Sequence, residues 1–220
     1  MTVAVVLLAA VLGGLTGEVM RRRLNRLAYR RPPEAADDPD ETAFATPGRR
    51  FWVPVVLAGT WAALGWRVLD ETAVSDPLNW VRFAAWLAFA GIGAWLAVID
   101  LDVNRLPDRG QLVLATLMVA AGVCLAWGEP GRLLTGLGAG LVCGLGFLIV
   151  HTISRGGLGL GDVKLIAICG WWLGLSSVAA VFAGVIAACL LGIAFSLVKR
   201  VRQFAFGPWL VAGTVLAGLT

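Results

Sequence analysis

Histidine, lysine and closely spaced cysteines are scarce in this chain, and their scarcity excludes several kinds of site. The 220 residues include one histidine and four cysteines. No cysteine lies within four residues of another, and all lie inside apolar runs: Cys124, Cys143, Cys169 and Cys189. The sequence therefore contains neither a CxxC pair nor a set of zinc ligands. We expect no metal and no cofactor.

Charged side chains are also few. They make up 15% of the chain, against 59% hydrophobic residues, and the mean hydropathy is +0.82. A soluble domain is about 25% charged and about 45–50% apolar, so the composition indicates a polytopic membrane protein. We predict an all-α fold, a single membrane domain over residues 1–220 and about eight transmembrane helices. The predicted spans are 2–20, 51–66, 81–100, 111–128, 132–153, 162–175, 177–198 and 204–220.

The basic residues flank the apolar runs and so indicate topology. Six arginines follow the first run within residues 21–31, which predicts a retained helix with its N-terminus outside. This topology places 15 of the 18 Lys and Arg residues in the cytoplasm and three outside: Arg67, Arg82 and Arg132. We expect no nucleic-acid partner, because no soluble basic face is present. The polar segment 21–50 is predicted to be a flexible cytoplasmic loop.

Two carboxylates occur where an apolar span begins or ends. Asp100 closes the third predicted span, and Asp162 opens the sixth. Burying a charged Asp at the centre of a spanning helix costs roughly 2.5–3.5 kcal/mol, so such residues usually serve a function. The predicted topology puts both on the cytoplasmic side. Two acids on one membrane face suggest an aspartyl hydrolase that acts on a membrane-bound substrate.

Two neighbouring carboxylates cannot both ionise cheaply, so they divide the acid and base roles. The ionised one takes a proton from water, and the protonated one hydrogen-bonds the scissile carbonyl. Asp162 is an N-cap type of residue at a helix N-terminus, where the helix dipole favours its ionised form. That favours Asp162 as the base, but the assignment stays open. The preceding glycines allow positive φ angles and a close approach by an extended peptide: Gly156, Gly157, Gly159 and Gly161.

Each feature also has a structural interpretation. The Gly-x-Gly-Asp stretch could be only a loop that ends in an N-cap, and Asp100, Asp102 and Asp108 could form a solvated turn. A phosphate loop is set aside, because the Lys-Ser/Thr pair is missing. The small-residue stripe Gly136, Gly140 and Gly144 is predicted to serve helix packing. His151 is predicted to make a polar contact at a helix end. Lys164 is interpreted as a snorkelling cation or as a mismatch with the helix dipole.

The combination of motifs resembles the type IV prepilin leader peptidases, aspartyl proteases of the GxGD class. The resemblance covers roughly residues 80–220. The matching residues are Asp100 with Pro107-Asp108, Gly159-Leu160-Gly161-Asp162-Val163-Lys164, and Phe206-Gly207-Pro208-Trp209 at the start of the last helix.

The resemblance implies roles for the matched residues. Asp100 and Asp162 would be the catalytic pair. The rest of the matched motifs would support the site: Gly159, Gly161, Lys164, Pro107 and Asp108. The substrates would be prepilin or pseudopilin precursors in the lipid bilayer of a bacterial cytoplasmic membrane. Cleavage would follow the Gly that ends a short basic leader, on the cytoplasmic side.

The N-terminal part departs from the family pattern. Many members carry two CxxC pairs in the loop after the first helix, and here that loop has no cysteine. We therefore do not expect the N-methyltransferase activity, dependent on S-adenosylmethionine, of the bifunctional members.

The residues leave two alternative functions open. Presenilin and signal-peptide-peptidase proteins share the Gly-x-Gly-Asp motif. In their earlier motif helix they carry Tyr-Asp, where this chain has Ile99-Asp100. A small transporter could use the two aspartates as proton or cation sites, although we find no internal repeat.

Overall fold

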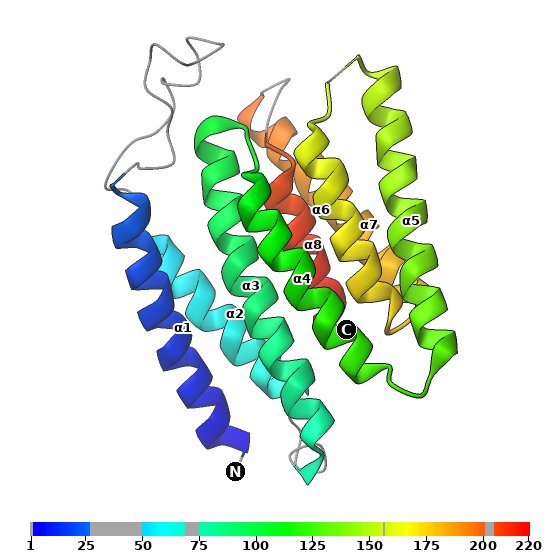
Figure 1. The fold of residues 1–220 in the computed structure, drawn as a ribbon. Helices are drawn as coiled ribbons and strands as arrows, with labels where there is room; N and C mark the ends of the chain where they lie inside the picture. Colours follow the sequence, from blue (N-terminus) through cyan, green and yellow to red (C-terminus); the bar gives the residue numbers. More distant parts are fainter. Residues whose placement is uncertain (1, 27–49, 69–74, 156, 201–204) are drawn as a thin grey trace. The chain divides into compact units, whose positions relative to one another are not determined.

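The computed structural model describes residues 2–26, 50–68, 75–155, 157–200 and 205–220, and every regular element in these ranges is an α-helix. There are eight helices: α1 Thr2–Leu24, α2 Trp52–Val68, α3 Pro77–Val103, α4 Asp108–Leu125, α5 Pro130–Ile153, α6 Leu160–Gly174, α7 Val178–Lys199 and α8 Gly207–Leu219 (Figure 1). This confirms the predicted all-α polytopic membrane fold.

Five of these helices are long and apolar enough to cross a membrane: Val3–Leu24, Pro77–Val103, Asp108–Leu125, Pro130–Ile153 and Val178–Val198. A shorter apolar helix is Gly207–Leu219. All eight predicted spans correspond to a helix within a few residues at each end. The outside position of the N-terminus stays a prediction.

Helix α1 continues beyond its predicted end at residue 20. It runs to Leu24 because Glu18 forms ion pairs with Arg21 and Arg22, both at 2.7 Å, one turn further along the helix. Arginines in the last turn also stabilise a helix C-terminus. Residues 27–49, the larger part of the predicted flexible loop, lie outside the described residues.

The chain divides into two compact units, Met1–Arg105 with α1 to α3 and Leu106–Thr220 with α4 to α8. The prediction of a single membrane domain stays a prediction. In the first unit, α1 packs closely on α2. A Cβ added to Gly13 would lie 2.8 Å from the Leu57 carbonyl oxygen, and one added to Gly17 would lie 2.5 Å from the Pro54 Cα.

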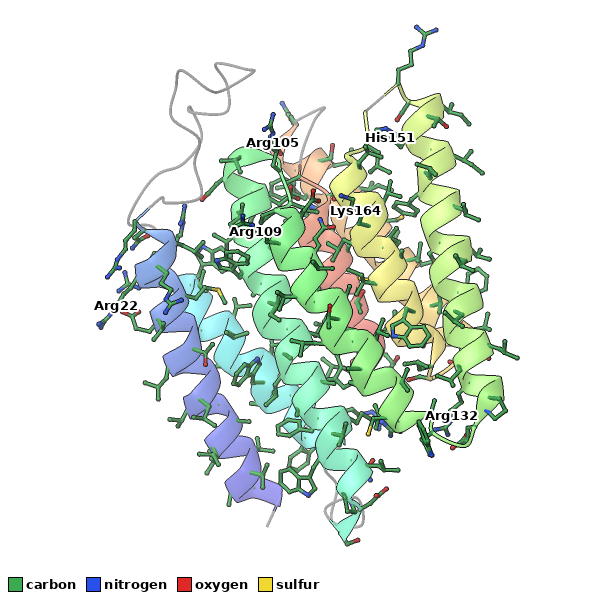
Figure 2. The ribbon with its side chains drawn as sticks, viewed as in Figure 1. Arg22, Arg105, Arg109, Arg132, His151 and Lys164 are labelled. Atoms are coloured by element: carbon green, nitrogen blue, oxygen red, sulfur yellow. The ribbon has the colours of Figure 1, made fainter. Side chains whose placement is uncertain are left out.

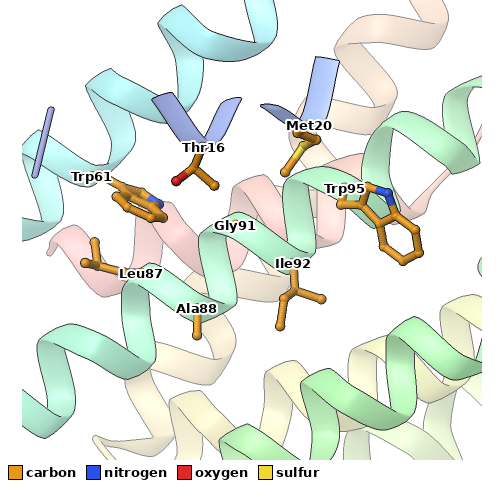
Figure 3. Close-up of a pocket in the computed structure, with 8 residues that line it drawn as sticks. All are labelled: Thr16, Met20, Trp61, Leu87, Ala88, Gly91, Ile92 and Trp95. Atoms are coloured by element: carbon orange, nitrogen blue, oxygen red, sulfur yellow. The ribbon is translucent and has the colours of Figure 1, made fainter. Parts of the chain in front are cut away.

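The first unit also has an open pocket of about 340 Å³ among α1, α2 and α3. Figure 3 shows its lining, which is apolar apart from the Thr16 hydroxyl and two indole N–H groups: Thr16, Met20, Trp61, Leu87, Ala88, Gly91, Ile92 and Trp95. No residue of this lining carries a titratable group. The pocket therefore offers nothing for acid–base chemistry.

Helix α6 is the centre of the second unit. It contacts α4, α5, α7 and α8, and Figure 1 shows it flanked by α4 and α5. All of its residues from Cys169 to Gly174 are buried. A helix enclosed on several sides reads as apolar all round, which is why the sequence shows no polar face for it.

The small-residue stripe of α5 packs against α6, as predicted. A Cβ on Gly140 would lie 3.1 Å from the Ala167 carbonyl oxygen, and one on Gly144 would lie 3.1 Å from the Ala167 Cβ. In return, a Cβ on Gly170 of α6 would lie 2.9 Å from the Ala139 carbonyl oxygen. Glycines on both helices therefore let the two backbones approach closely.

This packing predicts opposite effects for two alanine substitutions. Gly170→Ala forces a methyl group against α5 backbone, and overpacking of this kind costs about 1–3 kcal/mol. Gly146→Ala is the matched control on α5, because a Cβ there meets nothing within 4 Å and gains up to about 1 kcal/mol of helix propensity. We expect the thermal unfolding midpoint of the detergent-solubilised protein to fall for Gly170→Ala and to hold or rise for Gly146→Ala. Equal shifts for both would contradict the packing described here.

Candidate active site

Asp100 lies in the last turn of α3, in the first unit, and only 4% of it is exposed. The helix ends at Asn104, which adopts the left-handed conformation (φ 48°) and donates its N–H to the Asp100 carbonyl at 2.8 Å. Asn tolerates this conformation well, so it is a suitable residue for the end of the helix. Asp100 is therefore a buried acid at a defined helix end and not part of a solvated turn.

Asp102, two residues after Asp100, forms an ion pair with Arg50. The side chains are 12% and 6% exposed. From the sequence, Arg50 has only a topological role and Asp102 only a place in a solvated turn, and neither pattern predicts this pair. The two residues are 52 positions apart, and no local pattern connects them.

Asp162 lies in the second unit, in the first turn of α6, and is 8% exposed. The helix begins at Leu160 with Gly159 as its N-cap, so the prediction that Asp162 is the N-cap is wrong. It is the third helical residue, where an acidic side chain reaches back towards the cap. Its Oδ2 lies 3.3 Å from the position of a Cβ on Gly159. Its Oδ1 is buried and has no hydrogen-bond partner among the residues that the structure describes.

The glycines of this turn make room for neighbouring groups, and none of those described has a positive φ angle. Gly157, Gly159 and Gly161 do not use the positive φ angles that glycine allows, and Gly156 lies outside the described residues. A Cβ on Gly161 would lie 2.9 Å from the Leu106 Cβ, and one on Gly159 would crowd the Asp162 carboxylate. Both motif glycines thus let neighbouring groups approach the aspartate turn.

Two polar contacts join the start of α4 to this turn. Lys164 Nζ forms an ion pair with Asp108 Oδ1 at 2.6 Å, and Gln111 Nε2 donates to the Gly161 carbonyl at 3.1 Å. Pro107 is the N-cap of α4, and its carbonyl accepts hydrogen bonds from the backbone N–H groups of the first helical turn. The Pro-Asp motif and the Gly-x-Gly-Asp-x-Lys motif therefore form one structure within the second unit.

Gln111 is the residue of this contact that the sequence did not single out. The available signal was a lone amide at the first position of a predicted apolar span. It is 3% exposed, and its Oε1 has no partner among the described residues.

His151 and Phe206 also shape the second unit. His151 Nδ1 lies 2.5 Å from the Leu158 carbonyl oxygen, which ties the end of α5 to the loop before α6 and confirms the predicted helix-end contact. Phe206 is the N-cap of α8 and stacks on Phe147 with ring centroids 6.0 Å apart. Figure 2 shows His151, Arg109 and Lys164 towards one end of this unit and Arg132 at the other.

The ion pairs beside the two motif aspartates are Arg50 with Asp102, and Lys164 with Asp108. Among the described residues no three His, Cys, Asp or Glu side chains cluster to hold a metal ion. Asp162 shares the second unit with all five predicted supporting residues, whereas Asp100 belongs to the first unit. The meeting of the two carboxylates therefore stays a prediction.

Comparison with known proteins points to one family. The sequence model of the type IV leader peptidase family matches residues 86–197. The chain is 31% identical over 128 residues to the "Prepilin leader peptidase/N-methyltransferase" of Bacillus subtilis, which covers 56% of this chain and 50% of that protein. The protein of the same name from Burkholderia pseudomallei is 35% identical over 146 residues, with coverage of 59% and 45%.

A further relative is the "Type 4 prepilin-like proteins leader peptide-processing enzyme" of Escherichia coli O78:H11. It is 30% identical over 150 residues, which cover 63% of this chain and 53% of that protein. The chain thus spans about half the length of the curated relatives it matches. No solved structure gives a significant match.

Two ion pairs, one in each unit, predict very different stability costs. Arg50→Met removes one partner of a buried pair and takes this contact from the Asp102 carboxylate, which costs about 3–5 kcal/mol. Lys164→Met removes one partner of an exposed pair, with side chains 54% and 76% exposed, which costs about 1 kcal/mol or less. We expect a large fall in the thermal unfolding midpoint for the first variant and a small one for the second. A fall of similar size in both would contradict this ranking.

Proposed function

Because the chain belongs to the type IV leader peptidase family, we propose that it is a membrane aspartyl endopeptidase that removes the short basic leader of type IV prepilin-like precursors. The cut follows the Gly that ends the leader, at the cytoplasmic face of a bacterial cytoplasmic membrane. The observation that carries the proposal is the joining of the Pro-Asp motif to the Gly-x-Gly-Asp-x-Lys turn around a buried Asp162. Family membership favours this function over a transporter or a presenilin-like protease.

Asp100 and Asp162 are the proposed catalytic pair. One carboxylate is ionised and accepts a proton from water, whose oxygen attacks the scissile carbonyl carbon. The protonated partner donates a hydrogen bond to the carbonyl oxygen and stabilises the negative charge that develops there. Proton transfer to the leaving nitrogen then breaks the C–N bond and releases the mature chain and the leader carboxylate.

The chain's own connectivity supports this pairing. Asp108 follows Asp100 by eight positions in the sequence, and Asp108 is ion-paired with Lys164, two positions after Asp162. A short connection therefore links the segment that carries the first acid to the turn that carries the second. The burial of both acids also supports a catalytic role, since buried carboxylates are expensive and are retained where they serve a function.

The substrates proposed here are membrane-anchored precursors, so the lipid bilayer is part of the working complex. N-methylation of the mature chain is not proposed, because the cysteine pairs of the bifunctional members have no counterpart in this sequence.

Removal of either catalytic carboxylate is predicted to abolish leader cleavage. When a model prepilin is co-expressed with the enzyme, Asp100→Asn and Asp162→Asn should each leave only the precursor on a gel, a loss of at least about 1,000-fold. The amide is close in size to the carboxylate but can neither accept the proton of water nor donate an O–H. Both variants should still insert into the membrane at wild-type levels.

The matched control is Glu129→Gln. This acid pairs with Arg132 at 2.8 Å, beyond the end of α4 that is remote from Lys164. It should process the precursor normally. Cleavage that survives either aspartate substitution would rule out the pair.

A cross-linking experiment tests whether the two acids meet. In a background with all four cysteines replaced by alanine, Asp100→Cys and Asp162→Cys together should be joined by a short bifunctional thiol reagent in native membranes. A protease site inserted within residues 104–107, between α3 and α4, then reveals the cross-link as a fragment that stays whole on a denaturing gel. The pair Asp100→Cys with Glu129→Cys is the control and should separate. If the first pair separates as well, the shared site is refuted.

A further inference from the structure

Gln111 occupies an unusual position for an amide. It lies in the first turn of α4, is 3% exposed, and donates from Nε2 to the Gly161 carbonyl at 3.1 Å. That carbonyl belongs to the peptide bond whose nitrogen is the backbone nitrogen of Asp162. The amide therefore holds the peptide plane that leads directly into the proposed catalytic acid.

The hydrogen bond to Gly161 fixes which way the Gln111 amide is oriented. If the amide were flipped, Oε1 would face the Gly161 carbonyl oxygen, and two acceptors would repel each other. Oε1 must therefore point away from Gly161. Among the residues that the structure describes, neither Gln111 Oε1 nor Asp162 Oδ1 has a hydrogen-bond partner, although both atoms are buried.

Buried acceptors in proteins are normally paired with a donor, so each of these two oxygens has the capacity to accept one. Both lie on side chains that are tied to the same peptide unit. Water is a donor that the proposed reaction requires, and it fits this capacity.

We propose that Gln111 is a positioning residue for Asp162: its Nε2 fixes the Gly161–Asp162 peptide, and its Oε1 accepts a hydrogen bond from water at the aspartate. This inference rests on the proposed function and adds a residue to it. Gln111 sets the direction of the Asp162 carboxylate, so its loss affects the chemical step and not substrate binding.

The test compares Gln111→Met with Gln111→Glu. Methionine has a similar length and volume but neither donor nor acceptor of comparable strength. In purified enzyme with a model prepilin, we expect kcat to fall about 10- to 100-fold for Gln111→Met, with KM changed less than about twofold. A KM effect without a kcat effect, or wild-type values for both, would overturn the proposal.

Gln111→Glu adds a readout that a simple packing role would not move. The introduced carboxyl donates to the Gly161 carbonyl only when it is protonated. The ratio of its kcat to that of the wild type should therefore rise as the pH is lowered. The ratio is used because the neighbouring ionisable groups, Asp108, Asp162 and Lys164, are present in both proteins. A ratio that is independent of pH would overturn the positioning role, even if Gln111→Met does not fold.

Hydrogen exchange separates this proposal from the proposed function. Gln111→Met should increase amide exchange in residues 159–164 more than in the rest of the chain, whether or not the protein cleaves a prepilin. The matched control is Thr116→Val on α4, whose hydroxyl bonds only its own helix, at the Leu112 carbonyl. It should leave exchange, kcat and KM unchanged. Unchanged exchange at 159–164 in Gln111→Met would refute the positioning role, whereas a wild-type protein without peptidase activity would refute the proposed function.

Discussion

The hydrogen bond from Gln111 to the Gly161 carbonyl is the interaction on which the Asp162 turn depends most. The neighbouring Asp108–Lys164 pair is exposed, so water and salt reduce its worth to about 1 kcal/mol or less. The Gln111 side chain is 3% exposed and its contact with Gly161 is part-buried, so water replaces this hydrogen bond less readily than it replaces the exposed ion pair. The amide therefore fixes the turn, while the ion pair adds charge and helps to align the first turns of α4 and α6.

The short length of α6 fits this arrangement. Its 15 residues span about 22 Å, against a hydrocarbon core of about 30 Å. We expect its first turn to lie below the membrane interface, because the helix cannot cross the core alone. Contacts with α4, α5, α7 and α8 then replace lipid around it. Glycines such as Gly140 and Gly170 make this enclosure possible, since they admit backbone where a side chain would clash.

Much of the fold could be predicted from the sequence, because membrane spans and small-residue stripes are local patterns. The spans, and the packing role of the stripe with Gly140 and Gly144, followed from apolar runs and four-residue spacing alone, whereas α6 as its partner is seen only in the structure. The N-cap at Asp162 was predicted wrongly, because helix ends shift by a few residues without changing the pattern. The Arg50–Asp102 and Gln111–Gly161 contacts could not be found, since each joins residues 50 or more positions apart.

The Arg50–Asp102 pair shows how the end of α3 is held. Asp102 follows Asp100 by two residues, and two acids so close together repel each other when both are charged. The ion pair places the Arg50 cation against Asp102, which offsets this repulsion. The last turn of α3 is therefore joined to residue 50 by a buried polar contact, which an apolar periodicity in the sequence does not reveal.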